Sequence, residues 1–327
     1  MTGRVRRTTA AAEVSTGGSL ISDAKLKQLY ATMVRCRLLT EHAAGLSKQL
    51  GSAYLASMGQ EAIAAGWVID LRPEDTITLA PDDSFAGLVK GVPLGEIVVQ
   101  LSLRRSRPNH HQAANGSVHN ILPPSSTPEQ FRVVTEVASA NKRSKKGNVV
   151  VAFTRATTSL LSPWKETLEV AGKRRLPILF VVENNPWFQT SRAMPLTPAP
   201  GNSLHPSSNH AGSLATGKEE PLIEQARRYG LPILTVDGND VVAVYRVAYE
   251  SLERVRQGGG PVLVEGKTYR VSGQTKSSPG RQAERDPLAH MERYLKAKKL
   301  FTARWKNQLM DEFSQELDAA LRAARKA

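Results

Sequence analysis

The sequence has little cysteine, few aromatic side chains and no long apolar run, and each scarcity excludes a class of protein. The single cysteine, Cys36, cannot form an internal disulfide, which is typical of a reducing compartment. No uncharged apolar stretch is long enough to span a bilayer, so we expect no membrane protein. Aromatic residues make up only 6% of the 327 residues, which leaves few side chains on which nucleic-acid bases would stack.

Basic residues are abundant, and the formal net charge is +14. They occur in short clusters that are far apart in the sequence and are not interleaved with aromatics. This distribution indicates solvated loops and helix faces, with a weak, salt-sensitive affinity for polyanions and no specific nucleic-acid partner. The clusters are Arg4, Arg6 and Arg7; Arg104, Arg105 and Arg107; Lys142, Arg143, Lys145 and Lys146; and Lys296, Lys298 and Lys299.

Changes in composition divide the chain into three parts. Residues 1–21 predict a disordered basic tail without the apolar stretch of a secretory signal; transit peptides and ordinary bacterial tails share this composition. Residues 22–287 predict the folded domain, and residues 288–327 predict a charged, amphipathic helical segment packed on it. We favour a bacterial cytoplasm over a mitochondrial matrix as the location.

Strand-like and helical patterns alternate through the second half of the sequence, after a loop-rich stretch over residues 73–127. Such alternation predicts an α/β fold with a doubly wound parallel sheet. Ligands of these sheets bind at the carboxyl ends of the strands. The strand-like runs are Val149–Phe153, Ile178–Glu183, Ile233–Val236 and Val262–Lys267; the helical patterns are Pro128–Ala140, Trp164–Arg174, Pro221–Tyr229 and Val241–Arg256.

The turn after the first of these strands is unusual for a phosphate site. It reads Thr154-Arg155-Ala156-Thr157, with neither glycine nor carboxylate. Thr157 and Asn184 are separated by 26 residues, and Asn184-Asn185 follow the next strand directly. This arrangement resembles the thiamine-diphosphate motif, in which Gly-Asp-Gly precedes Asn-Asn by about the same interval.

Eight further segments resemble one family in the same order along the chain. On these matches the chain is identified as a member of a family of α subunits. They belong to the first, decarboxylating component of 2-oxo acid dehydrogenase complexes of the pyruvate and branched-chain types. The resemblance implies the thiamine-diphosphate-binding fold, thiamine diphosphate with Mg²⁺ as cofactors, and a heterotetramer with a β-type subunit. The segments are LYATMVRCRLLTEHA (29–43), GQEA (59–62), LRPEDTI (71–77), KGVPLGEI (90–97), NGSVHN (115–120), LPILFVVENN (176–185), VDGNDVVAVY (236–245) and GPVLVEGKTYR (260–270).

The sequence departs from the family where the resemblance places the metal. The family's Gly-Asp-Gly falls on Arg155-Ala156-Thr157, so the aspartate that ligates Mg²⁺ is replaced by Ala156. The remaining ligands implied by the resemblance are Asn185 and the main-chain carbonyl of Trp187. Mg²⁺ prefers hard oxygen ligands in near-octahedral geometry, and two neutral ligands beside an arginine make a poor site.

Two further departures affect the diphosphate clamp and the active-site histidine. Asp82 stands where the family has an arginine that grips the diphosphate, and Gln274 stands where it has the histidine. An amide does not exchange protons near neutral pH as imidazole does. His119 matches a family position within NGSVHN, and a structural hydrogen-bonding role is favoured for it over catalysis. We hypothesise that Arg155 and Asp82 pair across the vacated pocket.

Three interpretations of the function follow. The first is a catalytically impaired pseudo-subunit, with weak or lost cofactor binding, that forms a homodimer or pairs with a β-type chain and modulates or scaffolds a dehydrogenase. The second is an active thiamine-diphosphate-dependent 2-oxo acid dehydrogenase subunit in which Arg155 neutralises the diphosphate in place of Mg²⁺. The third is a polyanion-binding protein that uses the basic surface.

Overall fold

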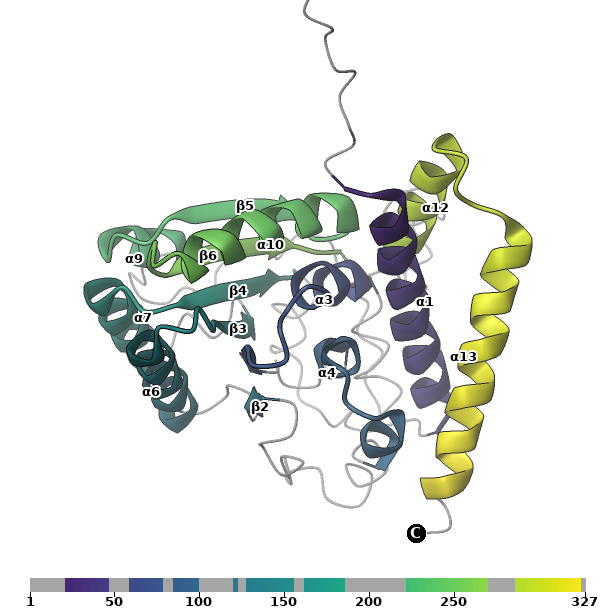
Figure 1. The fold of residues 1–327 in the computed structure, drawn as a ribbon, viewed down its shortest axis with the longest axis horizontal. Coiled ribbons are helices and arrows are strands. Elements are labelled where there is room, and N and C mark those ends of the chain that lie inside the picture. Colours follow the sequence, from purple (N-terminus) through teal and green to yellow (C-terminus); the bar gives the residue numbers. More distant parts are fainter. Residues whose placement is uncertain are drawn as a thin grey trace, which may run out of the picture.

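The computed structural model describes residues 21–46, 59–78, 85–99, 120–122, 128–155, 162–185, 222–269 and 286–324. Their central element is a six-stranded sheet in which every pair of neighbouring strands is parallel, in the order β2-β1-β3-β4-β6-β5 (Figure 1). The strands are β1 (Thr76–Thr78), β2 (Ile121–Leu122), β3 (Val150–Arg155), β4 (Ile178–Asn184), β5 (Ile233–Asp237) and β6 (Val262–Lys267).

Helices cover both faces of this sheet. On one face α3 and α10 pack against the strands, and on the other α6, α7 and α9 do so. The helices with described bounds are α1 (Asp23–Leu46), α3 (Glu61–Val68), α4 (Phe85–Lys90), α6 (Pro128–Ser144), α7 (Ser162–Arg174), α9 (Leu222–Arg228), α10 (Val241–Arg256), α12 (Pro287–Ala297) and α13 (Ala303–Ala324).

The burial of both faces explains why the central strands read as unbroken apolar runs. Successive side chains of a strand point to opposite faces. In β3, Val151 and Phe153 join the core under α3 and α10, whereas Val150 and Ala152 join the core under α6 and α7. All four are almost completely buried. A strand covered on one face alone would alternate apolar and polar residues instead.

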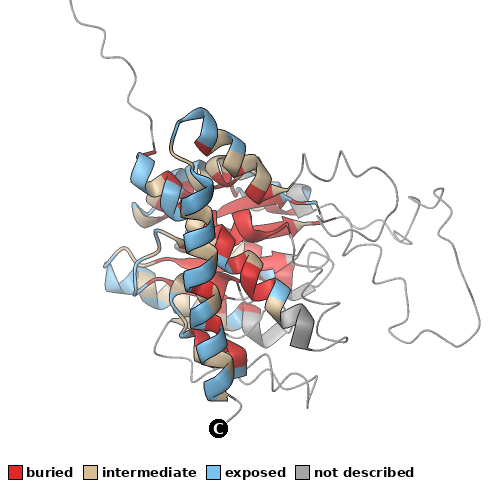
Figure 2. Ribbon diagram, turned by 90° about the vertical axis from the view of Figure 1, so that its right-hand side faces the viewer, coloured by how far each residue is buried: buried red, intermediate tan, exposed pale blue. Residues whose placement is uncertain are grey.

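A layer of three helices, α1, α12 and α13, packs beside the sheet. Tyr30 on α1 lies against Phe301 and Trp305, with ring centroids 5.7 and 5.4 Å away. Apolar side chains of α13, among them Phe313 and Leu317, complete the same core. The outer side of α13 is exposed, as expected for an amphipathic helix at the surface (Figure 2). Within the described residues, none of the helices combines the length and hydropathy that a membrane span requires.

The α/β fold with a doubly wound parallel sheet is confirmed, and the observed strands and helices follow the predicted alternation closely. The prediction of a loop-rich stretch over residues 73–127 is wrong in part, because β1, α4 and β2 lie inside it. The two strands are three and two residues long, too short to show a periodic pattern. They exist because β1 pairs with β3 on one side and with β2 on the other.

Candidate functional site

The carboxyl edge of the sheet gathers the ends of three adjacent strands. β3 ends at Arg155, β4 at Asn184 and β6 at Lys267, and the strands lie side by side in that order. The backbone register places Arg155 opposite Glu183 and Asn184 opposite Lys267. The predicted positions at 155 and 184–185, although nearly 30 residues apart in sequence, therefore lie on one edge of the sheet.

Other predicted site residues lie outside the described residues. These are Asp82, His119, Ala156, Thr157, Trp187 and Gln274, and the side chain of Arg155 is likewise outside them. The hypothesis that Arg155 pairs with Asp82 therefore stays a prediction.

Asn184 has a partner that the sequence did not predict. Its Nδ2 donates a hydrogen bond to Oε1 of Glu265 on β6, at 2.6 Å. The other oxygen of Glu265 accepts from the Thr235 hydroxyl on β5 at 3.3 Å and lies 3.9 Å from the Lys267 ammonium. The amide of Asn184 thus braces β4 against β6, while the neighbouring Asn185 is buried at the end of the strand. The two asparagines have different surroundings.

A buried ionic cluster begins at the start of α3, within the GQEA segment. Glu61 is fully buried, and its Oε1 lies 2.5 Å from Nε of Arg37 on α1. Its Oε2 accepts a hydrogen bond from the backbone N–H of Gly59 at 2.9 Å. Arg37 also pairs with Asp286, the N-cap of α12, at 2.9 Å. Burial lowers the pKa of Arg37, but Glu61 and Asp286 outweigh it and hold that pKa well above its ordinary value.

Asn239 joins the turn before α3 to the segment after β6. Its Nδ2 donates to the carbonyl of Gly59 at 3.0 Å, and its Oδ1 accepts from the backbone N–H of Tyr269 at 2.9 Å. The segments GQEA, VDGND and GKTYR, far apart in the sequence, therefore meet beside the carboxyl edge. The sequence identified these segments only by their resemblance to the family. Their contacts were not predicted, because a side chain that bonds to a backbone group produces no periodic pattern in the sequence.

Glycine is required at one point of this junction. A Cβ on Gly238 would lie 2.5 Å from Cγ2 of Thr268 and 3.0 Å from the carbonyl oxygen of Lys267. Real Cβ atoms do not approach a carbon as closely as 2.5 Å, and the contact with the carbonyl oxygen would also be tight. The small residue lets the turn after β5 pack directly on the end of β6.

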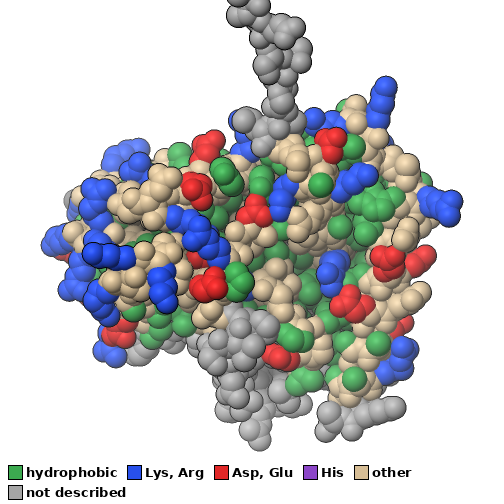
Figure 3. All heavy atoms as spheres, viewed as in Figure 1, with side chains coloured by type: hydrophobic (Ala, Val, Ile, Leu, Met, Phe, Trp, Pro, Cys, Tyr) green, Lys and Arg blue, Asp and Glu red, His purple; other side chains and the backbone are tan. Residues whose placement is uncertain are grey.

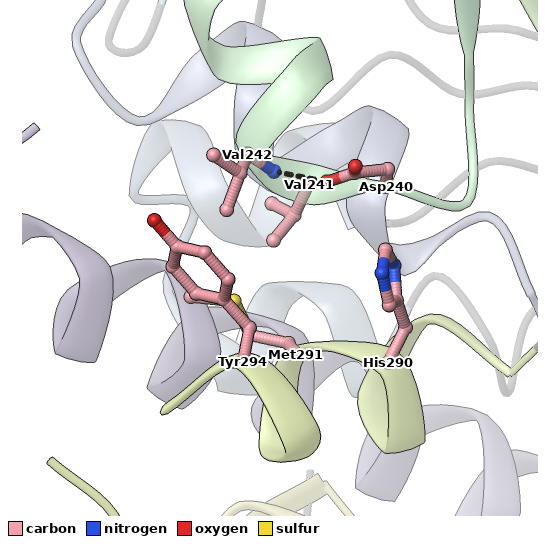
Figure 4. A pocket seen from close by; sticks show the side chains of 6 residues that line it. All are labelled: Asp240, Val241, Val242, His290, Met291 and Tyr294. Carbon is pink, nitrogen blue, oxygen red and sulfur yellow. Dashed lines mark hydrogen bonds between the residues drawn. The ribbon is translucent and has the colours of Figure 1, made fainter. Parts of the chain in front are cut away.

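A small pocket opens between the start of α10 and α12 (Figure 4). Its volume is about 80 Å³, well below the several hundred Å³ of a typical cofactor site. The carboxylate of Asp240 at its rim already accepts from the backbone N–H groups of Val242 and Ala243 and so caps α10. We interpret this pocket as part of the helix packing. Its lining residues are Asp240, Val241, Val242, His290, Met291 and Tyr294.

Comparisons with known proteins agree with this architecture. The family model described as "Dehydrogenase E1 component" matches residues 30–195 and 215–327. The chain is 29% identical over 320 residues to the chloroplastic pyruvate dehydrogenase E1 component subunit alpha-3 of Oryza sativa, covering 89% of this chain and 70% of that one. It is 27% identical to the pyruvate dehydrogenase E1 component subunit alpha of Porphyra purpurea, covering 92% and 88% of the two chains. The corresponding protein of Staphylococcus epidermidis is 27% identical, with 93% and 79% covered. With more than half of its length matched by the family model, this chain belongs to the dehydrogenase E1 component family, as an E1 α-type subunit.

Proposed function

We propose that this chain is an α-type pseudo-subunit, which retains the fold and the subunit assembly of its family and has lost its share of thiamine chemistry. The observation that carries the proposal is the end of β3. Arg155 is the last residue of that strand, beside the end of β4, and Ala156 follows it where the family has the metal-binding aspartate. Arg155 and Ala156 therefore offer a positive charge and a methyl group at the position where the family has a negatively charged metal ligand.

The donor set at this edge does not suit a Mg²⁺–diphosphate group. Asn185 offers an amide oxygen at most, and the alanine side chain has no oxygen. Mg²⁺ is usually held through one or two carboxylates together with phosphate oxygens and water. Among the described residues of β4 and β6, the acids Glu183 and Glu265 are buried, and Glu265 is already bonded to Asn184. We therefore expect thiamine diphosphate with Mg²⁺ to bind weakly or not at all.

Contacts inside the described fold join segments that are far apart in the sequence. The ion pairs of Arg37 with Glu61 and Asp286 and the hydrogen bonds of Asn239 tie together segments from both ends of the chain. The fold is thus held together although the cofactor-binding residues differ from those of the family. We take this to favour a protein whose role is to bind a partner. We propose a β-type dehydrogenase subunit as that partner, in a heterotetramer, with a homodimer as the alternative. The buried Cys36 and the bacterial relatives among the matches favour a bacterial cytoplasm.

The experiment that tests this function is co-assembly. The chain would be co-expressed with the β subunit of an active bacterial pyruvate dehydrogenase, with and without the active α subunit, and the products separated by size and identified by mass spectrometry. We expect complexes that contain this chain and β, and a change in dehydrogenase activity as this chain displaces the active α subunit. Recovery of this chain without β in every mixture, and no effect on activity, would contradict the proposal.

One observation favours the second interpretation, an active subunit without metal. The arginine at the end of β3 stands where the family binds the diphosphate, and a guanidinium forms bidentate contacts with phosphate groups. In that case thiamine diphosphate would bind equally well in the presence of EDTA. The cofactor titration that closes the Discussion separates the two interpretations.

A further inference from the structure

The amino edge of the sheet, opposite the candidate site, carries a concentration of positive charge. The helices of βαβ units run antiparallel to the strands, so α6, α7, α9 and α10 all end on this side. Figure 3 shows Lys and Arg side chains gathered at the left, over these helix ends. We name this surface the basic edge and define it by ten exposed residues: Lys142, Arg143, Lys145, Lys146, Lys173, Arg174, Arg175, Arg227, Arg228 and Arg254.

Hydrogen bonds join the ends of α6, α7 and α10 within the basic edge. The Lys142 ammonium of α6 donates to the backbone carbonyl of Arg174, the last residue of α7, at 2.5 Å. Arg175 donates to the carbonyl of Gly258, just beyond α10, at 3.3 Å. Arg256 at the end of α10 donates to the carbonyl of Gly147, just beyond α6, at 3.2 Å. The ends of three helices are therefore in direct contact.

Acidic side chains compensate little of this charge. Glu169 and Glu224 are each paired with a single basic residue, Lys173 and Arg227. Asp75 is fully buried and paired with Arg256, beneath the surface. The residues of the basic edge that form no ion pair with an acidic side chain, among the residues that the structure describes, include Arg143, Lys145, Lys146 and Arg174.

Stabilisation of helix ends accounts for seven of the ten residues. Basic residues in a last turn interact favourably with the helix dipole. This explains Lys142, Arg143, Lys173, Arg174, Arg227, Arg228 and Arg254. Lys145, Lys146 and Arg175 come after the helices end. They extend the charge from the helix ends into the loops that connect to β3 and β4.

We propose that the basic edge binds the phosphate backbone of double-stranded nucleic acid, without sequence preference. A protein partner of similar size is less well matched, because protein interfaces usually bury aromatic or other apolar side chains at their centre. Four large hydrophobic residues are exposed among the described residues, and of these Leu234 lies near the amino edge, as the second residue of β5: Val99, Leu234, Tyr249 and Tyr269. The positive charge concentrated on the basic edge matches a regular array of phosphates.

This surface is independent of the cofactor chemistry. β3 and β4 have six and seven residues, and a strand rises about 3.3 Å per residue, so the two edges of the sheet are about 20 Å apart. Nucleic acid on the amino edge would leave the carboxyl edge open. The inference therefore stands whether or not the proposed function is correct.

The test compares two triple variants of the full chain that change the net charge equally. The first, Arg143→Glu/Lys145→Glu/Lys146→Glu, reverses charge on the basic edge. The second, Lys299→Glu/Arg304→Glu/Arg322→Glu, does so on the exposed ends of α12 and α13. Each triple includes one residue in the left-handed region, with φ of 57° at Lys145 and 59° at Lys299, so the backbone cost is matched. The probe is a fluorescent duplex DNA of about 20 base pairs, titrated by anisotropy between about 50 and 200 mM salt.

We expect the first triple to weaken DNA binding at least about tenfold and to reduce the slope of log K against log salt by about 2 to 3, because each phosphate contact contributes about 0.9. The second triple is expected to change the affinity less than about threefold. Equal losses in the two triples would overturn the proposal, since net charge or another segment would then carry the binding. Failure of the parent chain to bind DNA at the lowest salt, or tighter binding of poly-glutamate than of DNA, would also overturn it.

Discussion

The ionic cluster at the start of α3 gives a quantitative prediction for Glu61→Gln. The substitution keeps the shape of the side chain and removes its charge. One oxygen of Glu61 lies 2.5 Å from the Arg37 guanidinium, which is 12% exposed, and the other accepts from Gly59. Removing one partner of a buried pair costs about 3–5 kcal/mol. Because Asp286 still pairs with Arg37 and the amide keeps one acceptor oxygen, we expect a loss of about 2–3 kcal/mol.

The assay is urea unfolding, followed by tryptophan fluorescence and circular dichroism. A matched control removes the acidic partner of another arginine on α1. Arg35 of α1 pairs with Glu316 of α13 at 3.0 Å, but the two side chains are 46% and 52% exposed. Glu316→Gln should therefore cost less than about 0.5 kcal/mol. If Glu61→Gln is no more destabilising than this control, the view that the cluster holds α1, α3 and α12 together is wrong.

Two further predictions concern packing and pH. Burial raises the pKa of Tyr30 well above its ordinary value, helped by its hydrogen bond to Glu292. The stability from its neutral hydroxyl is therefore complete below about pH 10, the pKa of tyrosine in the unfolded chain, and falls as the pH rises further. The difference between wild type and Tyr30→Phe in urea midpoint should shrink between about pH 9 and 11, and a constant difference would contradict this. Gly66→Ala places a Cβ 2.5 Å from Cγ1 of Val244 and should cost about 1–3 kcal/mol. Gly95 lies in a short helical segment, residues 94–99, and a Cβ there would meet nothing within 4 Å, so Gly95→Ala should stabilise the chain by about 0.5–1 kcal/mol. Similar thermal midpoints for the two variants would refute the packing argument.

The sheet was predictable because its strands carry a strong local signal. The apolar runs from Val149 to Phe153 and from Ile178 to Glu183 are buried on both faces, so their sequence alone indicates strands of a parallel sheet. The β1 and β2 strands were not predictable in the same way. A segment as short as Thr76–Thr78 is a strand because β3 lies beside it, and that pairing depends on the tertiary fold.

The candidate site was predictable in position but not in its contacts. Asn184 comes at the end of a buried strand and therefore lies on the carboxyl edge of the sheet. Ligands of parallel sheets bind at this edge. Its hydrogen bond to Glu265 spans 81 residues of sequence, and the bond from Asn239 to Gly59 spans 180. Contacts over such distances follow from the strand order, in which β4 pairs with β6, and no local pattern encodes that order.

The measurement that tests the central claim most directly is calorimetric titration of thiamine diphosphate into the chain, alone and with a β-type subunit, with Mg²⁺ and again with EDTA. A variant that restores the family motif, Arg155→Gly/Ala156→Asp/Thr157→Gly, serves as the comparison. We predict no binding to the parent chain in any of the four conditions, and Mg²⁺-dependent binding only in the restored variant. Tight, Mg²⁺-dependent binding to the parent chain would contradict the loss of cofactor chemistry, and binding that survives EDTA would show that Arg155 replaces the metal.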